Sequence, residues 1–386
     1  MVFITILLLN LLPSFRGEPQ VPCYFIFGDS LVDNGNNNGL MTQAKANYLP
    51  YGIDFPGGPT GRFTNGRNIA DIIAELLGFD SYIPPFATAT GSNIVKGVNY
   101  GSGAAGIRDE TGIQLGGRIS LNVQLLNHLV TIARITALLG NKTAANEYLT
   151  KCIYTVGMGN NDYINNYLMP QFYPTSREYT PDEFAQVLID QYKQQLTTLY
   201  KLRARKIAIF GLGLIGCIPA ELGMYGTNSS ACVDTINNQV QLFNDRLKPL
   251  VDELNSNLTD AKFIYINTTS ISSGDPSVIG ITVVNAPCCI VSTTFAKGQC
   301  VPGSVPCRDR TKYVFYDNFH PVELVNLVMA GRSYNALLPS DAYPYDIRRL
   351  AQIVETNIGF DVDYKVNPEP DQDMGHEAED GELDSQ

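Results

Sequence analysis

Short apolar segments alternate with long amphipathic segments along most of this chain. Four short segments are rich in aromatic and β-branched residues and bounded by turn residues, as buried strands are: YFIF at 24–27, CIYTVGMG at 152–159, KIAIFGLG at 206–213 and KFIYINTT at 262–269. Segments of helical periodicity lie between them, at 68–78, 119–140, 180–200 and about 235–258. Alternating strands and helices predict a parallel sheet covered on both faces. The expected fold is α/β, a three-layer α/β/α sandwich with a central parallel sheet.

Local signals mark the ends of the predicted helices. Thr180 and Glu183 form a capping box, with Pro181 at the first helical position. Gly78 and Gly140 each follow a periodic segment and are expected to end it. No internal repeat or linker interrupts the pattern, so residues 21–358 are expected to form a single domain.

The two ends of the chain differ in composition from its middle. Residues 1–17 contain an apolar run too short to span a bilayer comfortably, and they are interpreted as a signal peptide with an uncertain boundary. Residues 363–386 are interpreted as an acidic disordered tail. Within it, residues 367–386 hold eight acidic residues and no Lys or Arg, so the formal charge of −11 leaves only −3 for the rest. The domain offers no electrostatic case for binding nucleic acid, and no later segment is long and apolar enough for a membrane span.

The eight cysteines favour an oxidising compartment. Four of them crowd one Gly/Pro-rich segment without the C-x-x-C spacing of zinc sites: Cys288, Cys289, Cys300 and Cys307. Cys217 and Cys232 flank another loop, and we predict disulfides within each group, although the pairing inside the larger group is not deducible. Glycosylation triplets compatible with secretion begin at Asn141, Asn228, Asn257 and Asn267.

Two familiar motifs are missing or incomplete. The G-x-G-x-x-G strings at 101–106 and 211–216 lack the following helix and acidic residue of a dinucleotide site. The G-x-S-x-G motif of another hydrolase class is absent. The glycine strings therefore do not predict a dinucleotide cofactor.

Ser30 follows the first predicted strand in a Gly-Asp-Ser turn that leads into a string of turn formers, DNGNNN. Open α/β sheets bind ligands beyond the carboxyl ends of their strands, so Ser30 is either a turn residue or a nucleophile. Asp317 precedes His320 by three residues, which places both on one face of a helical turn. Such a carboxylate can orient an imidazole that takes a proton from a hydroxyl. The alternative is that Asp317 or Asn318 caps the helix that begins with PVELV.

Two further segments contain potential hydrogen-bond donors. Asn161, in GNND after the second predicted strand, has a side chain with two N–H groups that could face an oxyanion. The alternative is that Asn161 only forms a turn. The small-residue loop GVNYGSGAAGI at 97–107 could donate through its backbone. The other histidines are His128, expected to pack or lie on a helix surface, and His376, in the acidic tail.

The order of these motifs resembles that of the GDSL (SGNH) hydrolases: Gly-Asp-Ser-Leu at 28–31, the glycine loop ending at 106, Gly-Asn-Asn-Asp at 159–162 and Asp-x-x-His at 317–320. The segments GDSLVDNGNNN, NNDYINNY, GLGLIGCIP and FHPVE are similar to those of the plant GDSL esterase/lipase branch. The resemblance implies a flavodoxin-like SGNH hydrolase fold with Ser30 as nucleophile, His320 as general base and Asp317 as orienting carboxylate.

The resemblance also implies an oxyanion hole formed by the Ser30 and Gly106 backbone and the Asn161 side chain, with Gly103 as the alternative glycine. One departure is Tyr316, where many relatives have Trp, and this substitution is expected to reshape the rim of the site.

The function implied is a secreted serine esterase or lipase in the cell wall or apoplast. It would hydrolyse lipid-like acyl esters through an acyl-enzyme, with no cofactor and no metal. Its partner would be a small-molecule ester, and the sequence does not indicate its oligomeric state. The alternatives are an extracellular acyltransferase of the cutin-synthase type, in which an alcohol replaces water, or a carbohydrate (acetyl) esterase. A further alternative is a non-catalytic wall-associated protein.

Overall fold

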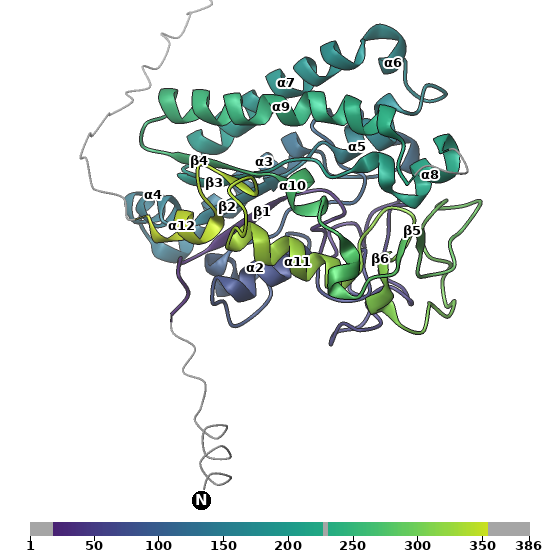
Figure 1. The fold of residues 1–386 in the computed structure, drawn as a ribbon. Coiled ribbons are helices and arrows are strands. Elements are labelled where there is room, and N and C mark those ends of the chain that lie inside the picture. The colour runs from purple at the N-terminus through teal and green to yellow at the C-terminus, as the bar shows by residue number, and fades with distance from the viewer. Residues whose placement is uncertain (1–17, 227–230, 354–386) are drawn as a thin grey trace, which may run out of the picture. The chain divides into compact units, whose positions relative to one another are not determined.

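Five strands form the central sheet of the computed structural model, which describes residues 18–226 and 231–353 (Figure 1). Their order is β1-β2-β3-β4-β7, with the bounds Tyr24–Gly28, Ile153–Gly157, Lys206–Phe210, Lys262–Ile266 and Ala342–Tyr343. Strands β1 to β4 are parallel, whereas β7 pairs antiparallel with β4. The predicted α/β fold is confirmed, with one antiparallel edge strand that was not predicted because two residues show no periodic pattern.

Helices cover both faces of the sheet because successive side chains of a strand point to opposite faces. Phe25 and Phe27 belong to one core, whose helices are α3 (Leu121–Leu139), α4 (Lys142–Thr150), α7 (Pro181–Lys201) and α9 (Asp234–Asn257). Tyr24 and Ile26 belong to a second core, whose helices are α2 (Ile69–Leu76), α11 (Glu323–Tyr334) and α12 (Ile347–Gln352). Figure 1 shows α7 and α9 on one side of the sheet and α2 and α11 on the other.

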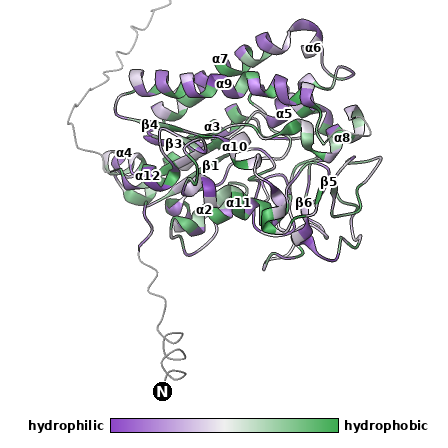
Figure 2. Ribbon diagram, in the orientation of Figure 1, coloured by the Kyte–Doolittle hydropathy of each residue, from purple (hydrophilic) through white to green (hydrophobic). Residues whose placement is uncertain are grey.

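The predicted helix ends agree with the structure to within a few residues. The capping box of Thr180 and Glu183 is present at the start of α7, with Pro181 in its first turn. Gly140 ends α3 in the left-handed backbone region, with φ of 67°, where glycine is favoured. Figure 2 shows hydrophilic and hydrophobic residues side by side along α7 and α9, as expected of helices with one buried face. The other α-helices of the described residues are α5 (Asn160–Asp162), α6 (Thr175–Glu178), α8 (Pro219–Tyr225) and α10 (Thr268–Ser272).

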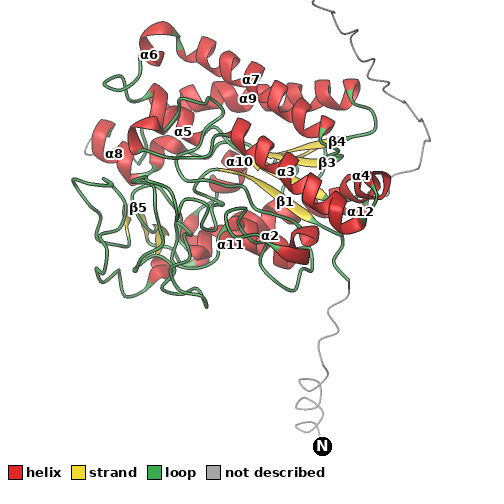
Figure 3. Ribbon diagram, turned by 180° about the vertical axis from the view of Figure 1, so that it is seen from behind, coloured by secondary structure: helices red, strands yellow, loops and turns green. Residues whose placement is uncertain are grey.

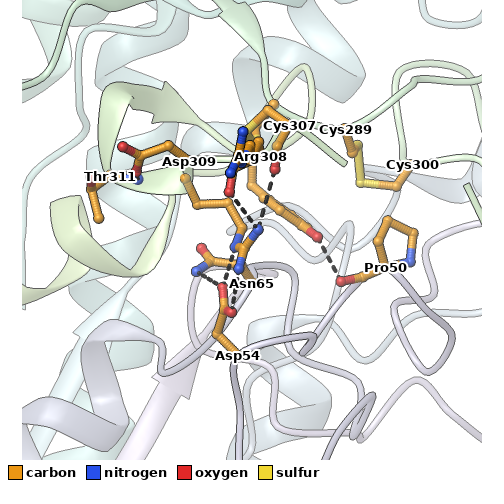
Figure 4. Close-up of a disulfide and its surroundings, with 12 residues drawn as sticks. Pro50, Asp54, Asn65, Cys289, Cys300, Cys307, Arg308, Asp309 and Thr311 are labelled. Atoms are coloured by element: carbon orange, nitrogen blue, oxygen red, sulfur yellow. Dashed lines mark hydrogen bonds and ion pairs between the residues drawn. A yellow bond between two sulfur atoms is a disulfide. The ribbon is translucent and has the colours of Figure 1, made fainter. Parts of the chain in front are cut away.

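Loops dominate the region around the short parallel pair β5 (Val283–Pro287) and β6 (Tyr313–Phe315) (Figure 3). Its disulfides are Cys288–Cys307 and Cys289–Cys300, and Figure 4 shows the second one as a yellow bond between the two labelled cysteines. A third disulfide joins Cys217 to Cys232. The prediction of disulfides within each cysteine group is confirmed.

A fourth disulfide, Cys23–Cys152, joins the residues that immediately precede β1 and β2. The sequence did not indicate it, because 129 residues separate the two cysteines. Their proximity follows only from the pairing of β1 with β2, whose first residues Tyr24 and Ile153 are partners.

Some sequence-based expectations lie outside the described residues: the signal peptide at 1–17, the acidic tail at 363–386, the triplet at Asn228 and His376. Of the other triplet asparagines, Asn141 and Asn257 are exposed and Asn267 is partly buried. Within 18–226 and 231–353, no helix has the length and apolar character needed to cross a membrane.

Candidate active site

Ser30 lies just beyond β1, at the carboxyl end of the parallel strands, and is partly exposed. Gly28 ends β1 at a crowded position, since a Cβ atom there would lie 2.6 Å from Cγ2 of Val32 and 3.0 Å from the carbonyl oxygen of Gly157. The buried Asp29 carboxylate accepts a hydrogen bond from Nδ2 of Asn160 at 3.0 Å. The turn that carries Ser30 is therefore tied to the segment that follows β2.

His320 connects Ser30 to Asp317. Its Nε2 lies 2.7 Å from Oγ of Ser30. Its Nδ1 lies 2.8 Å from Oδ2 and 2.9 Å from Oδ1 of Asp317. With the proton on Nδ1, the imidazole donates to the carboxylate and Nε2 accepts from the serine hydroxyl. Asp317 is fully buried and His320 is 6% exposed, so the polar chain reaches solvent near Ser30.

A tight turn holds Asp317 beneath the imidazole. Its Oδ1 accepts hydrogen bonds from the backbone N–H groups of Phe319 and His320, both at 2.8 Å. Helix α11 begins later, with Val322 as its N-cap residue. The alternative in which Asp317 or Asn318 caps this helix is therefore wrong. The imidazole ring of His320 also packs against the ring of Phe63, with a centroid distance of 4.8 Å.

The side-chain amide of Asn161 has a defined orientation. Its Nδ2 donates to the carbonyl of Ala105 at 2.9 Å, and its Oδ1 accepts from Nδ2 of Asn165 at 2.7 Å. These partners distinguish the nitrogen from the oxygen, because one accepts and the other donates. Nδ2 carries a second N–H, the type of donor that an oxyanion requires.

The two candidate glycines of the loop differ in their surroundings. The N–H of Gly103 already donates to Oδ2 of Asp33 at 2.9 Å. At Gly106, a Cβ atom would lie 2.7 Å from both carboxylate oxygens of Asp162, so only glycine fits without displacement. Burial raises the pKa of Asp162 to about 6.

The polar residues after Ser30 support this loop, a role that the sequence analysis missed. Nδ2 of Asn36 donates to the carbonyl of Gly101 at 2.7 Å, and Nδ2 of Asn37 donates to that of Gly103 at 3.0 Å. Both asparagines are buried. A buried loop needs partners for its backbone, and these amides supply them. The run of Asn residues was the available signal, but it was interpreted only as turn formers.

His128 and Tyr316, both considered in the sequence analysis, lie in the core and do not line the candidate site. His128 is buried among aromatic rings, its Nδ1 lies 3.0 Å from the hydroxyl of Tyr100, and burial lowers its pKa to about 3. Tyr316 is fully buried, and its hydroxyl donates to the carbonyl of Pro50 at 2.6 Å (Figure 4). The expectation that Tyr316 reshapes the rim is therefore wrong, since it lies in the core below the site.

A serine, an imidazole and a carboxylate in one hydrogen-bonded chain at the end of an α/β sheet are typical of serine hydrolases. A family model described as GDSL-like lipase/acylhydrolase matches residues 24–332. The chain belongs to this family of carboxylic ester hydrolases, and the resemblance stated from its motifs is confirmed.

Similar proteins of Arabidopsis thaliana match along almost their whole length. GDSL esterase/lipase At1g29670 is 54% identical over 88% of this chain and 93% of its own. GDSL esterase/lipase At1g29660 is 51% identical over 92% of this chain and 98% of its own. GDSL esterase/lipase At5g45670 is 49% identical over the same shares, 92% and 98%.

Proposed function

We propose that the chain is a secreted serine esterase or lipase that hydrolyses lipid-like acyl esters. The observation that carries the proposal is the hydrogen-bonded chain from Ser30 through His320 to Asp317, with links of 2.7 and 2.8 Å. Membership of a lipase/acylhydrolase family supports the reaction type.

The first half-reaction would form an acyl-enzyme. Oγ of Ser30 attacks the ester carbonyl carbon while Nε2 of His320 removes the hydroxyl proton. Asp317 stabilises the resulting imidazolium. Negative charge develops on the carbonyl oxygen, which accepts hydrogen bonds from the backbone N–H groups of Ser30 and Gly106 and from Nδ2 of Asn161. His320 then gives its proton to the leaving alcohol oxygen, and the acyl group stays on Ser30.

The second half-reaction would release the acid. Water attacks the acyl carbon while His320 removes one of its protons, and the same donors hold the oxyanion. When this intermediate collapses, His320 returns the proton to Oγ of Ser30, and the carboxylic acid leaves. Each proton transfer in both halves uses the same imidazole, which explains why its tautomer and orientation matter.

We infer that the enzyme acts outside the cell. Disulfides persist in oxidising compartments, and the described residues contain four of them with no free cysteine. The exposed triplet residues Asn141 and Asn257 are compatible with this location.

A panel of esters of graded acyl chain length tests the proposal, with Ser30→Ala as the inactive variant and Ser92→Ala, at an exposed serine, as the control. We expect hydrolysis by the wild type and the control only. A fluorophosphonate probe should attach to Ser30 in the folded protein, as peptide mass mapping would show. Attachment to another serine, or unchanged hydrolysis by Ser30→Ala, would refute the proposal.

A further inference from the structure

A fourth side chain extends the hydrogen-bonded chain on the far side of Asp317. The hydroxyl of Tyr51 donates to Oδ2 of Asp317 at 2.5 Å, and it accepts from the backbone N–H of Cys300 at 3.1 Å. Because Cys300 supplies a proton to this oxygen, the hydroxyl's own proton points to the carboxylate. Burial and the nearby Asp317 charge raise the pKa of Tyr51 well above its ordinary value, so the hydroxyl remains a donor.

Both oxygens of Asp317 lie within hydrogen-bond distance of Nδ1 of His320, but their other partners differ. Oδ1 is held by the backbone of its own turn. Among the described residues, the hydrogen-bond partners of Oδ2 are the side chains of Tyr51 and His320. Since Asp317 is fully buried, water cannot replace a lost donor there without entering the core. The hydroxyl of Tyr51 therefore determines how Oδ2 is presented to the imidazole.

The disulfide Cys289–Cys300 holds Tyr51 and the Asp317 segment together. The N–H of Cys300 donates to Tyr51, and the N–H of Cys289 donates to the carbonyl of Tyr316, next to Asp317, at 2.9 Å. The ring of Tyr51 is fully buried and packs edge-on against that of Tyr316, with a centroid distance of 5.8 Å. One covalent bond thus links the two backbone segments that position the carboxylate.

We propose that Tyr51 is a positioning residue for the reaction, held in place by the Cys289–Cys300 disulfide. Its hydroxyl fixes the Asp317 carboxylate against His320 and disperses part of its negative charge. The inference rests on the proposed function, because it assigns Tyr51 to the same Ser30 chemistry. It adds a residue 266 positions away in sequence from the carboxylate that it holds.

The variant Tyr51→Phe removes this donor while keeping the ring. We expect kcat to fall roughly tenfold or more with little change in KM, since a hydrogen bond to a buried charge is lost. Without the donor, the carboxylate charge is more concentrated and the Asp317–His320 pair holds a proton more readily. The acid limb of the pH–rate profile should therefore move to higher pH, which a purely structural role would not produce.

Two matched controls come from the same aromatic cluster. The hydroxyl of Tyr48 donates to the carbonyl of Cys300 at 2.9 Å, and that of Tyr316 donates to the carbonyl of Pro50 at 2.6 Å. Tyr48→Phe and Tyr316→Phe remove the same atom without touching Asp317, so both should keep the wild-type pH profile. An unchanged kcat and profile in Tyr51→Phe, or an equal shift in the controls, would overturn the proposal.

Two further measurements keep the test decisive. If Tyr51→Phe does not fold, the double variant Cys289→Ser, Cys300→Ser replaces it, because it keeps the Tyr51 hydroxyl but removes the disulfide that supports it. This double variant should lower kcat and move the acid limb of the pH–rate profile to higher pH. An unchanged profile would overturn the proposal. The proton resonance of Nδ1–H in His320, read by NMR, should shift in Tyr51→Phe and not in Tyr48→Phe. This signal needs no turnover, so it decides the role of Tyr51 even if Ser30-dependent hydrolysis, and with it the proposed function, fails.

Discussion

Gln124 and Gly28 exchange two hydrogen bonds, although 96 residues separate them in sequence. The N–H of Gly28 donates to Oε1 of Gln124 at 3.0 Å, and Nε2 of Gln124 donates to the carbonyl of Gly28 at 2.8 Å. Gln124 is fully buried near the start of α3. Its side chain thus acts as a strand partner at the point where β1 ends and the turn to Ser30 begins.

The variant Gln124→Leu should reduce both stability and turnover. It keeps the approximate size of the side chain but leaves the N–H of Gly28 unpaired in the core, at a cost of about 1–3 kcal/mol in the free energy of unfolding. Turnover should fall because the Ser30 turn loses its support. Urea unfolding and kcat measure the two effects. Gln194→Leu, at an exposed position on α7, is the control and should change stability by only about 0.5 kcal/mol. Equal effects of the two variants would contradict this role.

Asn161 should contribute in the transition state. Asn161→Ala is expected to lower kcat by roughly 10²- to 10³-fold with little change in KM, because the donated N–H matters most when charge develops on the substrate oxygen. Asn161→Asp presents a carboxylate to that charge and should be no more active. A turn former would tolerate Asp, so near-normal turnover in Asn161→Asp would mean that the residue is only structural. Melting temperatures separate a catalytic from a structural role. If Asn161 is only structural, Asn161→Ala should mainly lower the melting temperature and have a smaller effect on kcat.

Local patterns explain what the sequence predicted and what it did not. The strands and long helices repeat an apolar pattern, and Ser30, Asp317 and His320 stand in short motifs whose order resembles a known family. By contrast, Gln124, Tyr51 and Asp33 act through partners 96, 266 and 70 residues away, respectively. A contact of this kind depends on how the layers pack and leaves no periodicity near either residue. The pairing of Cys23 with Cys152 was missed for the same reason.

Glu221 should make stability depend on pH. It is 4% exposed, and its Oε2 has no hydrogen-bond partner within the described part of the chain. Burial raises its pKa from 4.5 to about 7. A carboxyl group whose pKa is raised by folding stabilises the folded state at a pH below its ordinary pKa of 4.5. This contribution is lost as the pH rises through about 7.

The variant Glu221→Gln tests this dependence, because Gln keeps the shape and has no charge at any pH. Relative to wild type, it should gain on the order of 1–3 kcal/mol in the free energy of unfolding between about pH 4 and pH 8. Glu178→Gln, at an exposed position, is the control and should show a smaller change. Denaturant unfolding at both pH values measures the difference. A gain that is no larger for Glu221→Gln than for the control would show that the buried carboxyl group is not the cause.

The Cys23–Cys152 disulfide should stabilise the fold without affecting the chemistry. It closes a loop of 129 residues, against 15 for Cys217–Cys232. The chain-entropy estimate gives a loss of about 5 kcal/mol for replacing the first pair with Ala and about 3 kcal/mol for the second. Urea unfolding of the two double variants measures this order, and a larger loss for the second pair would contradict it. Cys23 and Cys152 precede β1 and β2, whereas Ser30 and Asn161 follow these strands. The folded Cys23→Ala, Cys152→Ala variant should therefore keep the wild-type kcat, because the site lies at the opposite end of both strands.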